Sequence, residues 1–427
     1  MVNCKIENLS FYFITLTKHY IVTSKFSLID YALWGMFFIW LIIDSITGFF
    51  IFIGHNIPLS QLFKLFIIFL IIVRLHKNKS NFCFFYLLLF YIVWYFLHLA
   101  LINENFTNAV SILLKFLSIV FLYLYFRFCV INFQDKTIIN ARKTLVIAWI
   151  IVAFNVVLGL LGYGIPSYGE NEKDMGVKGF FYAGNELGGI MAVIVPFIVY
   201  LVKVRLSGYK TAVAYIIITL IGVLIGTKSC ILVTLLSVFI VPLLYTSTKN
   251  RLRILLCFVI IIIALISIIS PFFDTISISA IDRWTYFYNT GGLTQLIFSG
   301  RDEFWEMKKE AFFYSPFFTQ MFGMGVEGKA VERDHLDSLI SFGYIGLFAV
   351  LLFFFYLLFV AIKSRKNNSL MKVVIFSDLL VLGIGYMAGH VWYSAMASIY
   401  IALFNSFSFV KYKGFLYGKI DKQQEIK

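Results

Sequence analysis

Charged residues are scarce in this sequence, and the common motifs of soluble nucleotide-dependent enzymes are missing. Only 14% of the 427 residues are charged, whereas 61% are hydrophobic, a share well above that of a soluble domain. There is no GxxxxGK[ST] loop, no GxGxxG after a strand, no HExxH and no DxD pair. ATP hydrolysis and dinucleotide chemistry are therefore not indicated.

Cysteine and histidine are few and dispersed. The five cysteines form no CxxC pair and no framework typical of a secreted domain. The six histidines lack the spacing of metal ligands, so we expect no metal site and no cofactor. The first 25 residues contain no small-residue cleavage site, which predicts that there is no cleavable signal peptide.

Long hydrophobic runs fill most of the chain. A run of roughly 20 apolar residues can cross a bilayer as a helix, and the sequence predicts an all-α polytopic integral membrane protein of about twelve transmembrane helices. The expected spans lie near 31–53, 62–73, 82–101, 110–126, 145–161, 187–202, 212–225, 230–244, 254–272, 339–362, 373–388 and 393–410.

The net charge of +14 is distributed unevenly among the connecting segments. Lys and Arg gather in 1–25, 74–79, 127–143, 203–210, 249–253, 363–372 and the tail from 411, whereas 55–61 and 102–108 contain neither. By the positive-inside rule the basic segments and both termini are cytoplasmic. The charge thus marks a membrane face, and we expect no nucleic-acid partner.

The longest connecting segment, 273–336, falls outside the cytoplasm in this scheme. Its Ser299-Gly300-Arg301-Asp302 sequence resembles a capping box, which predicts a helix that ends before Pro316. Apolar residues at spacings of three and four make this helix amphipathic, and 281–288 is rich in aromatic residues. We expect interfacial helices in one large extracytoplasmic loop.

Several ionisable residues are predicted at or beyond the outer membrane face. Fixed cations suit an anionic ligand such as a diphosphate, and a histidine can accept a proton from a hydroxyl group near neutral pH. Snorkelling of Lys228, surface positions for the arginines and a structural role for the histidine remain open alternatives. The group consists of Lys228, Arg283, Arg301, Arg333, Asp334, His335 and Asp337.

Some ionisable residues fall within expected spans, Asp44 and Lys64 among them. Asp44 is a candidate for a buried role, since a charge inside the membrane is costly. Lys64 lies near the outer end of its span, so we expect its side chain to snorkel.

The order of several short motifs resembles the bacterial O-antigen polymerase and O-antigen ligase family. The series runs from Asn185 in GFFYAGNELG, through Lys228 in GTKS, Arg301 in SGR with Trp305, and GMG, to His335 before GYIG. The chain departs from the family pattern at Cys230, where many members have Arg, and at Leu336, where many have Asn.

This resemblance implies a metal-independent glycosyltransferase that uses a polyprenyl-diphosphate-linked oligosaccharide outside the bacterial cytoplasmic membrane. Lys228, Arg301 and Arg283 would bind the departing diphosphate, and His335 would be the acceptor-side base or positioning group. We expect Asn185, Trp305, Arg333 and Asp337 to bind substrate. Membrane lipid, a flippase and chain-length regulators are the expected partners.

A polysaccharide polymerase is the leading hypothesis. A ligase would share the site and differ in the acceptor, a flippase or other transporter would have a similar number of spans, and a scaffold would not need the external cations. We divide the chain into N-terminal transmembrane helices (1–178), a core (179–362) with the external loop 273–336, and a C-terminal part (363–427).

Overall fold

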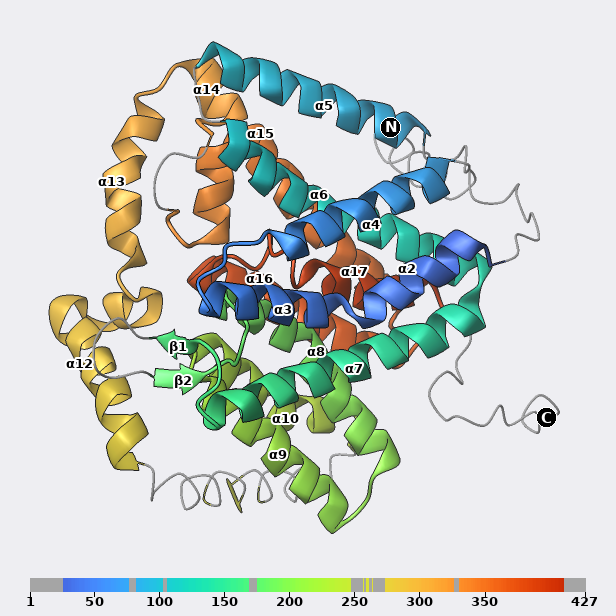
Figure 1. Ribbon diagram of the computed structural model, residues 1–427, viewed down its shortest axis with the longest axis vertical. Helices are drawn as coiled ribbons and strands as arrows, with labels where there is room; N and C mark the ends of the chain where they lie inside the picture. Colours follow the sequence, from blue (N-terminus) through green and yellow to red (C-terminus); the bar gives the residue numbers. More distant parts are fainter. Residues whose placement is uncertain are drawn as a thin grey trace, which may run out of the picture.

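The computed structural model describes residues 26–76, 82–102, 106–168, 175–246, 273–325 and 330–410, with isolated residues between 256 and 263. Within these ranges the protein is a bundle of long helices with a two-stranded sheet at one end (Figure 1). The expected all-α architecture is therefore confirmed, apart from the short sheet.

The N-terminal part contributes a layer of apolar helices. Ser27 caps the first of them in a capping box with Asp30, whose carboxylate accepts the Ser27 N–H at 2.8 Å. The next helix follows after a break at Ile39 and is bent by 50° relative to the first. The helices are α2 (Leu28–Phe38), α3 (Trp40–Phe52), α4 (Leu59–His76), α5 (Phe82–Leu101), α6 (Phe106–Asn132) and α7 (Gln134–Leu160).

The remaining elements begin with an antiparallel hairpin, in which Pro166 is paired with Val177. It consists of β1 (Pro166–Tyr168) and β2 (Met175–Val177). The helices that follow are α8 (Gly184–Arg205), α9 (Tyr209–Ile225), α10 (Lys228–Leu244), α12 (Phe273–Phe298), α13 (Arg301–Phe313), α14 (Phe317–Phe322), α15 (Asp334–Ser364), α16 (Met371–Ala388), α17 (Ser398–Ser406) and the 3-10 turn η3 (Phe407–Phe409).

Helix α8 forms the centre of the bundle. Its most apolar 18 residues are 83% buried, the largest share among the span-length helices of the described chain. It packs against α7, α10, α16 and α17, and it is hydrophobic on all sides, as expected of a fully surrounded helix. Any group at the start of α8 is therefore held rigidly by the core.

Helices long and apolar enough to cross a bilayer identify a polytopic integral membrane protein. The described residues contain six of them, or seven if the bent pair α2–α3 is one span. Large apolar side chains such as Phe348, Leu352 and Phe359 are exposed on α15, where lipid would cover them. The count of about twelve spans and the cytoplasmic termini remain predictions.

The expected spans correspond to helices, with local corrections. The range 254–272 lies largely outside the described residues, and each other range contains a helix. The last span does not begin at residue 393, because 389–397 is irregular and α17 starts only at Ser398. Lys64 does not snorkel: its Nζ lies 2.6 Å from Asp44 Oδ1, and both side chains are buried.

The helix predicted after Ser299 is confirmed as α13, which ends at Phe313 before Pro316. The capping box is wrong. Gly300 is the N-cap residue, with φ of 82°, and no side chain caps the helix. The Ser299 hydroxyl accepts a hydrogen bond from Lys228 instead, at 3.0 Å.

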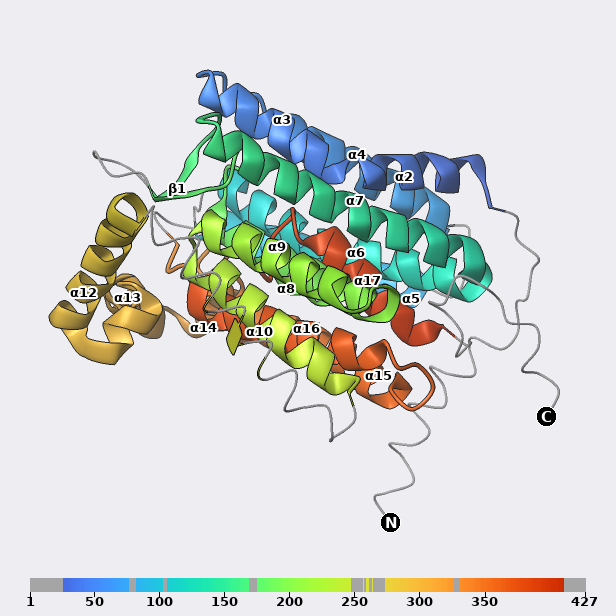
Figure 2. The same cartoon turned by 90° about the horizontal axis from the view of Figure 1, so that it is seen from below.

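Helices α12 and α13 lie at one end of the bundle, beside β1 (Figures 1 and 2). Helix α10 connects this end with the opposite one. Its first residue, Lys228, contacts Ser299, whereas Tyr245 at its far end donates a hydrogen bond to the Ser369 carbonyl in the turn between α15 and α16, at 2.6 Å. We call the end at Lys228 and Ser299 the cavity end. The end at Tyr245, where Arg365, Lys366 and Lys372 lie, is called the basic end.

Candidate functional site

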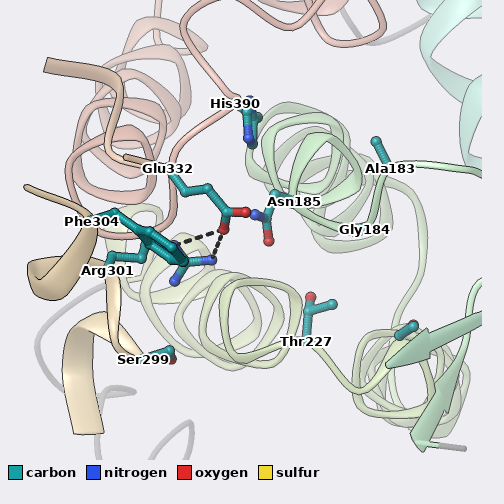
Figure 3. Close-up of a pocket in the computed structure, with 10 residues that line it drawn as sticks. Ala183, Gly184, Asn185, Thr227, Ser299, Arg301, Phe304, Glu332 and His390 are labelled. Atoms are coloured by element: carbon teal, nitrogen blue, oxygen red, sulfur yellow. Dashed lines mark hydrogen bonds and ion pairs between the residues drawn. The ribbon is translucent and has the colours of Figure 1, made fainter. Parts of the chain in front are cut away.

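A cavity of about 420 Å³ opens at the cavity end of the bundle. It is lined by residues from the hairpin, the starts of α8 and α13, the turn before α10, and the segments before α15 and after α16. Figure 3 shows most of these side chains around the opening. They are Ser167, Ala183, Gly184, Asn185, Thr227, Ser299, Arg301, Phe304, Glu332 and His390.

Three helices begin at this cavity. Asn185 is the second residue of α8, Thr227 is the N-cap of α10, and Arg301 is the first residue of α13. Neither α8 nor α13 has a side-chain cap, so their first backbone N–H groups are available to a ligand. The positive ends of the helix dipoles and the free N–H groups favour an anion in this cavity.

Arg301 supplies the formal positive charge of the cavity wall. Its Nε and Nη2 atoms both lie 3.1 Å from Oε2 of Glu332, and Nη1 donates to the Phe298 carbonyl at 3.3 Å. Figure 3 shows the two side chains pointing toward each other, with Asn185 beside the carboxylate. The contact with Phe298 keeps the guanidinium group in the wall.

Backbone strain is concentrated around this cavity. Among the described residues, the non-glycine residues with positive φ are Ser299 (55°), Glu332 (62°) and His390 (59°), and all three line the cavity. Such conformations cost free energy and persist where packing enforces them, often at functional sites. Gly389 shows this packing, because a Cβ there would lie 2.3 Å from the backbone carbon of Glu332.

The irregular segment 389–397 is fixed by hydrogen bonds to several helices. The Asp334 carboxylate accepts the N–H groups of Val391 and Trp392, at 2.9 and 2.8 Å. Ser394 donates to Glu186 at 2.7 Å. Irregular backbone within a membrane protein is tolerated where such partners satisfy it and it lines a cavity, and here it brings His390 to the cavity wall.

Lys228 contacts α12 and the turn that follows it, and it is not among the described residues that line the cavity. Its Nζ donates to the Leu296 carbonyl at 2.6 Å and to the Ser299 hydroxyl at 3.0 Å. The same atom lies 5.4 Å from the centre of the Phe287 ring. Lys228 thus joins the start of α10 to the turn between α12 and α13, from which Arg301 follows.

Arg333, His335 and Asp337 lie behind the cavity wall. The Arg333 guanidinium forms an ion pair with Asp302 at 3.1 Å and lies 4.0 Å from the Phe298 ring. The Asp337 carboxylate accepts the backbone N–H groups of Val331 and Arg333. The His335 ring stacks on Tyr386 at 4.4 Å. None of the three is among the residues described as lining the cavity.

The other two predicted site residues are placed differently. Trp305 packs edge-on against Phe313, with ring centres 6.1 Å apart, and is not among the described cavity residues. Arg283 lies within α12, and its side chain is outside the described part of the structure. Asn185 and Arg301 are therefore the predicted residues that line the cavity.

The loop before α8 is also well anchored. The Phe180 N–H donates to the Asn155 side chain at 3.0 Å, and Lys178 Nζ donates to the Tyr182 carbonyl at 2.8 Å. Burial lowers the pKa of Lys178. Within the described ranges, no group of three His, Cys, Asp or Glu side chains forms a potential metal site.

Glu332 and His390 were not identified by the sequence analysis. Glu332 stands next to Arg333 and three positions before His335, two predicted site residues. This proximity in sequence is the signal that could have pointed to Glu332. His390 follows Gly389 directly after the expected span 373–388, at the end of the span that the charge pattern predicts to be outside. Neither a motif nor metal-ligand spacing distinguishes it from the other histidines in the sequence.

Comparisons with known proteins agree with the motif order. The family model described as "O-antigen ligase like membrane protein" matches residues 33–283 and 289–413. No curated protein and no solved structure matches the chain. The chain belongs to the family of O-antigen ligase-like membrane proteins.

Proposed function

We propose that this protein is a polymerase that joins polyprenyl-diphosphate-linked oligosaccharide repeat units into a capsule, O-antigen or similar exopolysaccharide. Family membership supports glycosyl transfer. The observation that carries the proposal is the position of Arg301 in a cavity at which α8, α10 and α13 all begin. This arrangement suits a diphosphate leaving group.

In the proposed reaction an acceptor sugar hydroxyl attacks the anomeric carbon of the donor. The new glycosidic bond forms while the bond to the lipid diphosphate breaks, and the diphosphate leaves with the electron pair. Arg301 and the free N–H groups of α8 and α13 would stabilise the developing charge. Arg283 would add a second cation from α12, and Lys228 would hold the turn that carries Arg301.

An imidazole would accept or position the acceptor hydroxyl proton. His335 is the residue that the family resemblance indicates, whereas His390 is the one that lines the cavity. Asn185 is suited to hydrogen bonding with a sugar. We assign Arg333 and Asp337 to supporting the segment before α15, and Trp305 to the outer surface of the loop.

The proposed orientation places the cavity outside the bacterial cytoplasmic membrane. Arg365, Lys366 and Lys372 lie together at the basic end, and cytoplasmic loops are enriched in such residues. The donor oligosaccharide would then reach the cavity after a flippase has translocated it, and chain-length regulators would act on the same face.

Two other functions fit part of the evidence. A ligase would transfer a finished glycan to another acceptor at the same cavity, in keeping with the name of the matching family. A transporter would move lipid-linked sugars across the membrane. The polymerase remains the leading proposal, and the experiment below separates it from both alternatives.

The test is the glycan ladder formed in cells that lack the protein and are complemented at matched membrane levels. Wild type should restore the ladder, and Arg301→Ala should leave single lipid-linked units on the outer face. Lys366→Gln at the basic end is the control and should behave like wild type. Units accumulating on the cytoplasmic face would favour a transporter, and a complete polymer that is not attached to its acceptor would favour a ligase.

A further inference from the structure

Arg301 already has an anionic partner in the structure. Nε and Nη2 both contact Oε2 of Glu332 at 3.1 Å. A carboxylate therefore occupies the edge of the guanidinium group that would donate hydrogen bonds to a phosphate. Both residues line the cavity. A donor diphosphate that binds Arg301 must therefore compete with Glu332.

The geometry of the pair favours replacement of the Glu332 carboxylate by another anion on Arg301. The Glu332 side chain is 41% exposed, whereas that of Arg301 is 14% exposed. Because the Glu332 carboxylate is already partly hydrated, its side chain can swing further into water at little cost. Arg301 stays in the wall through its contact with the Phe298 carbonyl. The contact also uses a single carboxylate oxygen and lacks the two parallel bonds of the strongest Arg–carboxylate pairs.

The backbone of Glu332 stays in place during such an exchange. Its φ of 62° is enforced by close packing against Gly389, and the neighbouring Val331 and Arg333 N–H groups are held by Asp337. The side chain is the free part of the residue. A change of its rotamer is enough to release Arg301.

We propose that Glu332 is an internal counter-ion that occupies the diphosphate position on Arg301 and is displaced when the lipid-linked donor binds. This inference rests on the proposed function, because it assumes a diphosphate ligand. A diphosphate carries more negative charge than one carboxylate and offers more acceptor oxygens, so it outcompetes Glu332. In the absence of donor, Glu332 neutralises a cation that is mostly buried.

Direct binding of a polyprenyl diphosphate to the purified full-length protein in lipid nanodiscs tests this proposal. Glu332→Gln keeps the shape of the side chain and removes its charge, so we expect about fivefold tighter binding, as loss of a competing pair worth about 1 kcal/mol gives. Glu306→Gln is the matched control. It makes the same charge change on α13, at an exposed residue paired with Lys309, and affinity should change less than about twofold.

Tighter binding is a result that mere loss of structure would not produce. In the Arg301→Ala background the gain from Glu332→Gln should vanish, because the two residues compete through one contact. Unchanged or weaker binding by Glu332→Gln, or the same gain without Arg301, would overturn the proposal.

The outcome also separates this inference from the proposed function. If wild type and Arg301→Ala bind the polyprenyl diphosphate equally, or if wild type binds the uncharged polyprenol equally well, the cavity is not a diphosphate site and the proposed function fails. If Arg301→Ala weakens binding and Glu332→Gln leaves it unchanged, the diphosphate site stands and the counter-ion role of Glu332 is wrong.

Discussion

Both ends of the helix bundle carry several cations, but their surroundings differ. At the cavity end Arg301 pairs with Glu332, Arg333 pairs with Asp302, and Lys228 donates to Ser299. At the basic end Arg365, Lys366 and Lys372 border an open hollow of about 500 Å³. Among the described residues, none of these three has a carboxylate within ion-pair distance.

This difference separates two uses of positive charge. The basic-end cations are exposed, and the positive-inside bias requires only their presence on one side of the membrane. The cations of the cavity end are partly or largely buried and each is directed by specific acceptors, as a preorganised site requires. Substitutions should therefore have large effects at one end and small effects at the other.

The largest effect is expected at Arg301. Arg301→Ala should lower the rate of polymer formation by about 10²-fold or more, the range typical for loss of a charge-stabilising group. Arg301→Lys should recover part of the rate, since it restores the charge but not the planar fork of donors. The effect of either substitution is measured as the rate at which purified protein consumes lipid-linked units. A wild-type rate in Arg301→Ala would show that the cation of the cavity end is as dispensable as those of the basic end.

His390 is the next most informative position. If its imidazole serves the acceptor, His390→Ala should lower the maximal rate by about 10²-fold and leave the affinity for polyprenyl diphosphate nearly unchanged. His335→Ala in the same assay shows whether the histidine stacked on Tyr386 contributes independently. A large loss in His335→Ala together with a wild-type rate in His390→Ala would assign the acceptor role to His335.

Gly389 tests whether the strained backbone matters for the cavity end. Gly389→Ala places a Cβ against the Glu332 backbone at a residue with φ of 65°, so we expect a loss of stability of about 1–3 kcal/mol. Gly383→Ala on α16 is the control, because a Cβ there meets nothing within 4 Å. Thermal unfolding in detergent should show a lower midpoint for the first variant and little change for the second.

The smallest effect is expected at the basic end. Gln substitutions at Arg365, Lys366 and Lys372 together should keep the polymerisation rate of each correctly inserted molecule within about twofold of wild type, since exposed charges contribute little locally. Their effect should appear in the fraction of correctly oriented protein, which protease accessibility in membrane vesicles measures. A strong loss of rate per inserted molecule would show that this end also takes part in the reaction.

Hydropathy predicted the helices well because the signal is local. A run of apolar residues in lipid must satisfy its own backbone hydrogen bonds, which an α-helix does without a partner. The same signal did not reveal where a run is interrupted. The expected span 393–410 starts with irregular backbone. The Asp334 carboxylate, more than fifty positions earlier, holds this segment by accepting hydrogen bonds from the N–H groups of Val391 and Trp392.

The candidate site was predictable only in part. Asn185 and Arg301 belong to recognisable motifs, and both line the cavity. Glu332 and His390 belong to no motif, and their backbone strain is visible only in three dimensions. The same holds for Lys64, whose pairing with Asp44 depends on α3 and α4 lying side by side.

The sequence by itself determined that the chain is a membrane protein, where most of its helices lie, and to which family it belongs. These properties depend on composition, local periodicity and motif order. Only the tertiary structure decided which polar groups share one cavity. The starts of α8, α10 and α13 and the segment at His390 are distant in sequence. Packing of α10 and α16 against α8, and the contacts of Lys228 with Leu296 and Ser299, bring them together.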